Sequence, residues 1–376
     1  MTPVVGEGQS QVRIPELDGL RGLAVAGVLM WHFLGCLLNP DLGSWTRIVY
    51  HITILGRTGV DLFFVLSGFL ITSIILNRTQ PINDFLCRFY WRRALRIFPS
   101  YVILVFIFWH LIAIGVNNSA FNNDIPWWRH LTFTQNLWMS SHEMWGPTAI
   151  SITWSVAIEE QFYLIWPLIL ILAPYRQISV ILVILAICSC AYRAINWIEW
   201  HRVFMPYVGT LCRLDGLVLG SLIACLYKDP MFEEKMAKKY HLLRFFFIGL
   251  LILFPIFFIC ISTNLPKTMF VWGHTYLSVF YGSCLLMILK WRNTRRTAWL
   301  RGNSLCQLGL ISYTLYLFHP IFIDGIFTVF NRQASIASLG DSGLAALALM
   351  LSLLWSKLSL RFLEAPLTGY GRRWSY

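Results

Sequence analysis

The chain has 376 residues, of which 57% are hydrophobic and only 13% are charged, and its mean hydropathy is +0.61. A soluble globular domain carries about 25% charged residues, so the composition excludes an ordinary soluble protein and predicts a polytopic membrane protein. The net charge of +12 lies mostly in short segments between apolar stretches. This placement is typical of cytoplasmic loops in membrane proteins, so we expect no nucleic-acid partner.

Ten apolar segments are long enough to cross a bilayer, which requires about 20 residues in a helix. The sequence therefore predicts an all-α transmembrane bundle of about ten helices. The predicted spans cover residues 17–38, 52–77, 97–116, 154–174, 177–197, 205–227, 244–262, 270–290, 308–330 and 341–363. We expect residues 1–376 to form a single transmembrane domain without a soluble extracytoplasmic domain.

The distribution of basic residues predicts the orientation of the bundle. If the N-terminus lies in the cytoplasm, most of the 30 Lys and Arg residues fall in cytoplasmic segments and few in outer loops. The positive-inside rule then predicts ten spans with both termini in the cytoplasm, in the plasma (inner) membrane. The nine cysteines show no metal-ligand spacing, and we interpret them as small buried hydrophobic residues rather than a disulfide framework or metal site.

The first predicted span, LDGLRGLAVAGVLMWHFLGCLL, contains Asp18, Arg21 and His32. Arg21 and His32 are eleven positions apart, so the two side chains leave nearly the same helical face, roughly 16 Å apart along the axis. Asp18 lies three residues before Arg21 and is expected to pair with it. One interpretation is an interfacial ion pair and a structural core histidine. Ionisable groups within a membrane usually mark a substrate path or a catalytic site, so we favour a functional role.

The second span contains GRTGVDLFFVLSGFLIT. Arg57 and Asp61 are four residues apart and are expected to pair. Ser67 and Gly68 are small residues that permit close helix packing. This segment favours a structural role.

A basic segment, FYWRRALRIFP, occupies residues 89–99 after the second span and contains Arg92, Arg93 and Arg96. Simple positive-inside charge, or binding of anionic membrane lipids, explains such a segment. Recognition of a phosphate-rich ligand explains it equally well, because the forked guanidinium group matches phosphate oxygens. The segment alone leaves both interpretations open.

The fourth span begins ITWSVAIEEQFYLIWP, in which Ser155, Glu159 and Tyr163 share one helical face. Glu159 is a candidate acid or base, or a residue that orients one. The alternative is a carboxylate that simply benefits from the helix macrodipole.

Two further segments indicate a polar interior. Arg213 and Asp215 fall within the sixth span and are expected to form ion pairs across helices. His319 lies near the middle of the ninth span, in SYTLYLFHPIF. The remaining histidines, such as His130, His142 and His274, are expected in or near outer loops and carry little signal.

Together these segments resemble the acyltransferase-3 family of integral-membrane O-acyltransferases, which includes bacterial O-antigen acetylases. Six segments occur in the family order: LDGLRGLAVAGVLMWHF, GVDLFFVLSGFLIT, FYWRRALRIFPSY, TWSVAIEEQFYLIWP, RLDGLVLG and SYTLYLFHPIF. The residues that match the family's short motifs are Arg21 and His32 (Arg-x10-His), Arg93 and Arg96 (Arg-x-x-Arg), and Trp154, Ser155 and Glu159 (Trp-Ser-x-x-x-Glu). Val156 replaces the commoner Leu in the last motif.

The resemblance implies an acyl donor, usually acetyl-CoA or another acyl-CoA, that approaches from the cytoplasm, and no metal. The acceptor would be a hydroxyl group on a glycan, glycolipid or glycosylated small molecule. Some family members carry an added esterase-like domain, whereas here transfer is expected within the membrane domain.

The resemblance also implies roles for particular residues. His32 would act as the general base or be transiently acylated, with Arg21 beside the donor path. Glu159 would orient or recharge the base, or bind the acceptor. The expected donor-binding residues are Arg92, Arg93, Arg96 and Arg21, and the expected acceptor-binding residues are Trp154, Ser155, Tyr163 and His319.

Two other classes of protein fit parts of the sequence. A transporter or flippase for a sugar or lipid-linked intermediate would also bury Arg, Asp, Glu and His. The sequence shows no paired interrupted spans of the kind that mark an inverted repeat. A receptor or scaffold would bind its ligand through the polar segment 117–153. This interpretation leaves the basic segment 89–99 without a specific function.

Overall fold

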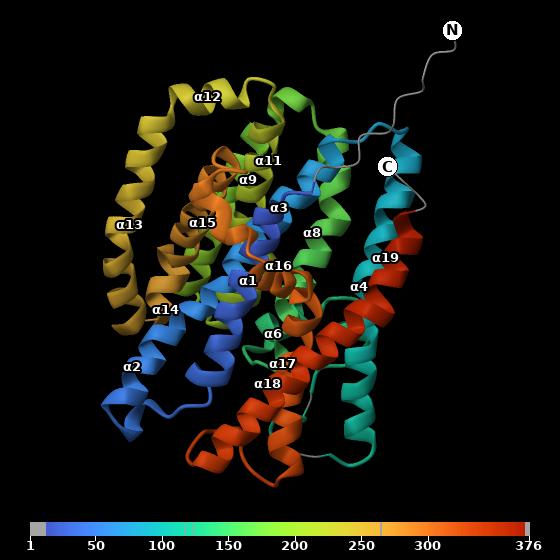
Figure 1. Ribbon diagram of the computed structural model, residues 1–376, viewed down its shortest axis with the longest axis vertical. Coiled ribbons are helices and arrows are strands. Elements are labelled where there is room, and N and C mark those ends of the chain that lie inside the picture. The colour runs from blue at the N-terminus through green and yellow to red at the C-terminus, as the bar shows by residue number, and fades with distance from the viewer. Residues whose placement is uncertain (1–12, 117, 123, 264, 373–376) are drawn as a thin grey trace.

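The computed structural model describes residues 13–116, 118–122, 124–263 and 265–372, and this part of the chain is helical without named strands (Figure 1). The long helices are α1 Pro15–Met30, α2 Ser44–Thr53, α3 Gly59–Leu76, α4 Ile82–Ala113, α8 Thr153–Leu172, α9 Tyr175–Ile198, α11 Leu214–Lys228, α13 Tyr240–Thr263, α15 His274–Lys290, α17 Ser312–Val329 and α18 Leu339–Ser359. The short helices are α5 Trp127–Leu131, α6 Gln135–His142, α7 Thr148–Ser151, α10 Phe204–Val208, α12 Phe232–Lys238, α14 Leu265–Thr268, α16 Asn303–Leu310 and α19 Ala365–Arg372.

The helices confirm a polytopic transmembrane bundle. Nine helical segments among the described residues are long and apolar enough to span a membrane. A tenth span is possible if α16 and α17, which meet at a bend of 70°, are counted together. The predicted number of about ten spans is therefore confirmed by length and composition.

One boundary differs from the sequence prediction in a way that affects the site. The predicted third span began at residue 97, with the basic segment before it as a connection. In the structure α4 begins at Ile82 and continues through this segment and through Pro99. Arg93 and Arg96 therefore lie on a helix that packs against α8, which fixes their direction.

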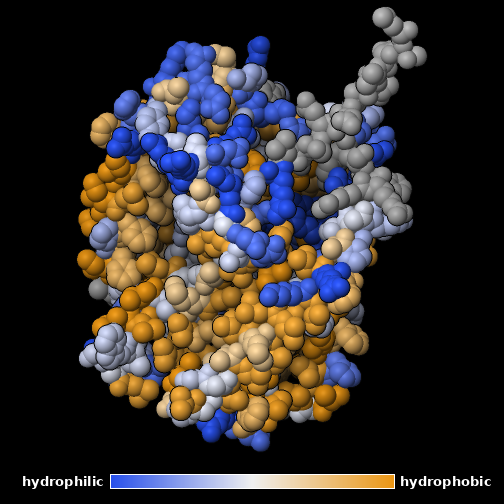
Figure 2. Space-filling view, in the orientation of Figure 1, coloured by the Kyte–Doolittle hydropathy of each residue, from blue (hydrophilic) through white to orange (hydrophobic). Residues whose placement is uncertain are grey.

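The two ends of the bundle differ in polarity. Helix α1 begins and α19 ends toward the same end, near which α12 also lies (Figure 1). Hydrophilic residues gather over this end on the face shown, whereas hydrophobic residues cover the middle and lower part (Figure 2). We call the first the basic end, because α12 and the turn Arg295–Arg301 carry several Lys and Arg residues. A common end for α1 and α19 agrees with an even number of spans, and the cytoplasmic orientation stays a prediction.

Helices α3 and α11 form one of the closest contacts in the bundle. A Cβ atom added to Gly68 would lie 1.8 Å from the carbonyl oxygen of Leu217, and one added to Gly220 would lie 2.0 Å from that of Val65. Only glycine permits this approach, as is common where membrane helices pack without lipid between them. The contact fixes the start of α3 relative to the start of α11, where several charged side chains lie.

Candidate functional site

Three arginines gather in the half of the bundle toward the basic end. Arg21 of α1 interacts electrostatically with Arg96 of α4, which also repels Arg93 one turn away. The Arg93 guanidinium lies 4.3 Å from the centre of the Tyr163 ring. All three are half-buried, and none forms an ion pair with a carboxylate among the described residues. Glu160 and Glu364 interact electrostatically with Arg93 and Arg96 without forming such a pair. The guanidinium groups thus keep donors that a polyanion can bind.

Glu159 belongs to this cationic cluster. Its Oε1 accepts a hydrogen bond of 2.8 Å from the Ser67 hydroxyl, and its Oε2 accepts one of 3.0 Å from the Tyr163 hydroxyl. The carboxylate interacts electrostatically with Arg21 and Arg93. The expected shared face of Glu159 and Tyr163 is thus a direct contact. Glu159 has no contact with His32 among the described residues, so its expected action on that base has no direct geometric support.

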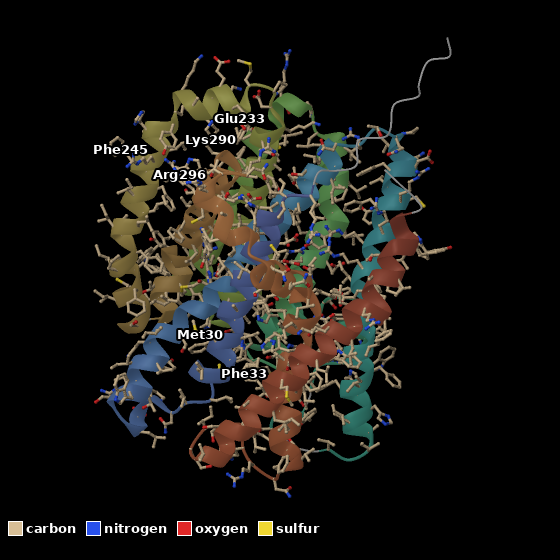
Figure 3. All side chains as sticks on the ribbon, viewed as in Figure 1. Met30, Phe33, Glu233, Phe245, Lys290 and Arg296 are labelled. Atoms are coloured by element: carbon tan, nitrogen blue, oxygen red, sulfur yellow. The ribbon has the colours of Figure 1, made fainter. Side chains whose placement is uncertain are left out.

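His32 lies toward the opposite end, in a π-helical turn Trp31–Gly35 that ends α1. The neighbouring Met30 and Phe33 mark its depth, well below Lys290 and Arg296 of the basic end (Figure 3). π-Helical turns of this kind often occur at functional sites because they displace side chains from the regular helical register.

The two histidines predicted from separate spans meet in the interior. The rings of His32 and His319 lie 4.7 Å apart at 63°. The Nδ1 atom of His32 lies 2.9 Å from the Val28 carbonyl oxygen, and that of His319 lies 3.2 Å from the Leu315 carbonyl oxygen. Because a carbonyl oxygen only accepts hydrogen bonds, Nδ1 carries the proton in both rings and each Nε2 keeps a lone pair. The Nε2 of His319 is fully buried without a partner among the described residues.

Ser155 and Trp154 lie beyond the two histidines, and Tyr316 connects Ser155 to His319. The Ser155 hydroxyl lies 2.7 Å from the hydroxyl of Tyr316, whose ring lies 6.0 Å from that of His319. The Trp154 ring lies 5.2 Å from that of Tyr207. Ser155 and Trp154 therefore lie on the side of His32, whereas Glu159, one turn further along α8, lies with the arginines.

Two local ion pairs predicted from spacing are wrong. Asp18 pairs with Arg13, at 2.7 Å, rather than with Arg21. Asp61 pairs with Arg213, at 2.8 Å, rather than with Arg57. Both carboxylates lie in the first turn of a helix, where they face residues from outside that helix.

The prediction that Arg213 and Asp215 pair across helices is confirmed, although not with each other. Arg193 of α9 donates to Asp215, at 2.8 Å, beside the Arg213–Asp61 pair. The Nδ1 atom of His274 lies 3.0 Å from Oδ1 of Asp61. Arg193 and Arg213 are 0% and 1% exposed, so this network is part of the core. Sequence reasoning missed His274, which it placed near an outer loop. The only sign in the sequence that His274 is buried was its position four residues inside the start of the predicted span 270–290.

A small cavity lies beside this network. Its lining includes Arg57, Trp154, Tyr207 and His274, and it has room for about one water molecule. Among the described residues, no group of three or more His, Cys, Asp or Glu side chains is arranged to hold a metal ion.

The fold and this interior define an integral membrane protein with two polar centres at different depths. The first is the cluster of Arg21, Arg93 and Arg96, the second is the pair of His32 and His319, and α1 with its π-helical turn connects them. The chain belongs to the acyltransferase domain family, which matches residues 14–360. The resemblance identified from the six sequence segments is therefore confirmed.

Curated relatives cover nearly the whole chain. The Bacillus subtilis (strain 168) protein YrhL is 26% identical over 391 residues, covering 96% of this chain and 56% of the relative. The O-acetyltransferase OatA of Staphylococcus aureus (strain NCTC 8325 / PS 47) is 27% identical over 376 residues, covering 95% and 58%. The peptidoglycan O-acetyltransferase OatA of Listeria monocytogenes is 26% identical over 380 residues, covering 96% and 57%. The chain thus spans less than two thirds of the length of these relatives. No solved structure matches significantly.

Proposed function

We propose that this protein is a membrane-bound O-acyltransferase that moves an acetyl group from cytoplasmic acetyl-CoA to a hydroxyl group of a glycan. The observation that carries the proposal is the separation of two centres along α1. Toward the basic end lie arginines that form no ion pair among the described residues. Toward the other end the half-buried His32 packs against the buried His319, whose Nε2 has no partner in the described part of the chain. Family membership supports the same reaction class.

The arginine cluster suits the donor. Coenzyme A carries several phosphate charges, which Arg21, Arg93 and Arg96 would hold at the predicted cytoplasmic side with Arg92 nearby. Because these guanidinium groups repel one another, a bound polyanion relieves an unfavourable interaction in addition to forming new contacts. Glu159 accepts two hydrogen bonds in this cluster and would position Tyr163, over which Arg93 lies.

The histidine pair suits the chemistry. His32 would use its Nε2 lone pair to remove the proton from the acceptor hydroxyl, whose oxygen attacks the thioester carbonyl. The π-helical turn and the hydrogen bond from Nδ1 to Val28 hold the ring in the tautomer that this step requires. A transiently acylated His32 is the alternative, in which the same Nε2 atom attacks the thioester first.

The acceptor is proposed to lie between the histidines and the aromatic side chains beyond them. The unpartnered Nε2 of His319 can accept a second hydroxyl proton, and the hydroxyl of Ser155 can hydrogen-bond a sugar. Trp154 is buried and lines the small cavity, so it would stack on a sugar ring only if the packing around it opens. The names of YrhL, a putative peptidoglycan O-acetyltransferase, and of the Listeria monocytogenes OatA support a peptidoglycan-type glycan as the acceptor class.

The test is mass spectrometry of cell-wall glycans from a host that lacks this chain, with and without the expressed protein. We expect glycan fragments that gain the mass of one acetyl group, and no gain with His32→Ala. A transporter would leave the glycan masses unchanged while it redistributes the glycan across the membrane. Unchanged masses with correctly inserted protein would overturn the proposed function.

A further inference from the structure

Arg57 is a charge in the membrane interior that the proposed function has not used. It lies in the 3₁₀ turn Ile54–Thr58 before α3, with its guanidinium 5.2 Å from the Trp31 ring centre and 5.4 Å from that of Tyr207. Its Nη2 donates to the Tyr207 hydroxyl at 3.2 Å. This is its one hydrogen bond among the described residues, although a guanidinium has five N–H donors. Charged groups at this depth are costly unless they serve a ligand or a partner.

The charges around Arg57 do not neutralise it. Arg193 is paired with Asp215, and Arg213 is paired with Asp61. Two buried arginines thus balance two buried aspartates, and Arg57 remains as the surplus positive charge beside them. No carboxylate in the described part of the chain lies within ion-pair distance of Arg57.

The small cavity between these residues offers free donors and a positive potential. Arg57 and Arg213 line it together with Asp61, which is paired with Arg213, so Arg57 is the charge left over. The Nε of Arg213 is buried without a partner among the described residues. Helices α3, α8, α11 and α15 all begin at or beside its lining, at Gly59, Thr153, Leu214 and His274. These positions are changes of helix type inside longer helical segments, so the positive charge at the cavity comes from the arginine side chains. The cavity therefore favours an anionic group.

The size of the cavity decides between kinds of anion. It has room for about one water molecule, which fits a single oxygen atom and is too small for a carboxylate or a phosphate group. Arg57 also interacts electrostatically with His32, whose neighbour Trp31 lies under the guanidinium. An anionic oxygen beside the base of an acyl transfer is the oxyanion of the tetrahedral intermediate.

We propose that Arg57, assisted by Arg213, stabilises the oxyanion that forms during acyl transfer. This inference rests on the proposed function. In the step concerned, the acceptor oxygen forms a bond to the thioester carbon while its proton moves to Nε2 of His32. The carbonyl π electrons move to the oxygen beside Arg57. When they return, the C–S bond breaks and the coenzyme A thiolate leaves, taking the proton from His32.

The experiment measures acetyl transfer by the purified full chain from acetyl-CoA to soluble peptidoglycan glycan strands. Loss of one oxyanion donor lowers kcat by about 10²–10³, so we expect a fall of that size for Arg57→Gln. The KM values for acetyl-CoA and glycan should change by less than about twofold, because the contact forms only in the transition state. Arg57→Lys keeps the charge but loses the forked guanidinium group, and its kcat should lie between that of the unmodified protein and that of Arg57→Gln.

Arg202→Gln is the matched control, since Arg202 is an exposed arginine that also lies over a tryptophan, 6.0 Å from the Trp200 ring. It should leave kcat and both KM values unchanged. Calorimetric binding of acetyl-CoA, which depends on the distant arginine cluster, checks that the Arg57 variants are folded. If Arg57→Gln does not fold, Arg57→Lys alone decides, with kcat expected to fall at unchanged KM.

Two results would overturn the inference. A higher KM for the glycan at unchanged kcat would mean that Arg57 binds an anionic part of the acceptor. Unchanged kcat and KM would mean that it has no role in the reaction. Absence of transfer by the unmodified protein would instead refute the proposed function, so the two failures are distinguishable.

Discussion

The Asp61–Arg213 pair provides a quantitative test of the fold around the site. Asp61→Asn keeps the shape of the side chain but removes the charge that faces Arg213 at 2.8 Å and His274 at 3.0 Å. Arg213 is 1% exposed, so water cannot replace the lost partner. Removal of one member of a buried ion pair leaves an uncompensated charge in the core, which costs about 3–5 kcal/mol.

The expected loss is large enough to see in thermal unfolding. For a chain of this size a loss of about 3–5 kcal/mol lowers the unfolding temperature by roughly 4–6 °C. The assay is intrinsic-fluorescence melting of detergent-solubilised protein. Asp61→Leu combined with Arg213→Met should recover most of the loss, because neither member of the pair then leaves its partner charged and unpaired.

A matched exposed pair supplies the control. Lys238 and Glu234 form an i, i+4 ion pair on α12, with side chains that are 74% and 47% exposed. Glu234→Gln should change the stability by less than about 1 kcal/mol, because solvent screens such pairs. If Asp61→Asn lowers the unfolding temperature no more than Glu234→Gln does, the buried pair does not stabilise the fold and the reasoning is refuted.

Three further predictions concern other parts of the molecule. Gly68→Val should prevent the close contact of α3 with α11 and yield aggregated protein by gel filtration. The control Gly249→Val should remain monodisperse, because nothing lies within 4 Å of a Cβ atom added there. Equal elution profiles of the two variants would contradict this packing. Arg93→Gln with Arg96→Gln should weaken acetyl-CoA binding by calorimetry, and an unchanged affinity would remove these residues from the donor site. Burial lowers the pKa of His130 from 6.5 to about 4. The unfolded chain therefore binds a proton at this histidine before the folded protein does, and the free energy of unfolding falls as the pH drops from 6.5 toward 4. Acidification from pH 7 to pH 5 should therefore destabilise the unmodified protein by about 2 kcal/mol more than His130→Leu, as measured by urea unfolding, and equal losses would refute the assignment.

The sequence predicted the fold because length, hydropathy and basic-residue placement directly reflect the membrane environment. It did not predict the start of α4, because the basic segment FYWRRALRIFP reads as a polar connection. The structure continues the helix through it, with the aromatic side chains of Phe89 and Tyr90 packed against the core.

The candidate residues were found from the sequence, but their partners were not. Helical spacing suggested Asp18 with Arg21 and Arg57 with Asp61, because such pairs are the only ones that a linear sequence reveals. The actual partner of Asp61 is Arg213, which only the packing of α3 against α11 brings near. The meeting of His32 with His319 likewise depends on the packing of α1 and α17. His274 was missed because its position near the start of the predicted span 270–290 does not reveal the Asp61 and Arg213 side chains that it meets in the core.

The most direct test of the proposed function is acetyl transfer across a membrane by the purified full chain in sealed vesicles. Radiolabelled acetyl-CoA is supplied on the side of the basic end, and soluble peptidoglycan glycan strands on the other. We expect labelled glycan from the unmodified protein and from His142→Ala, a control in which an exposed histidine is removed, and none from His32→Ala. Equal labelling by His32→Ala would contradict the role of His32 as the base, and no labelling by any of the three would contradict the acyltransferase itself.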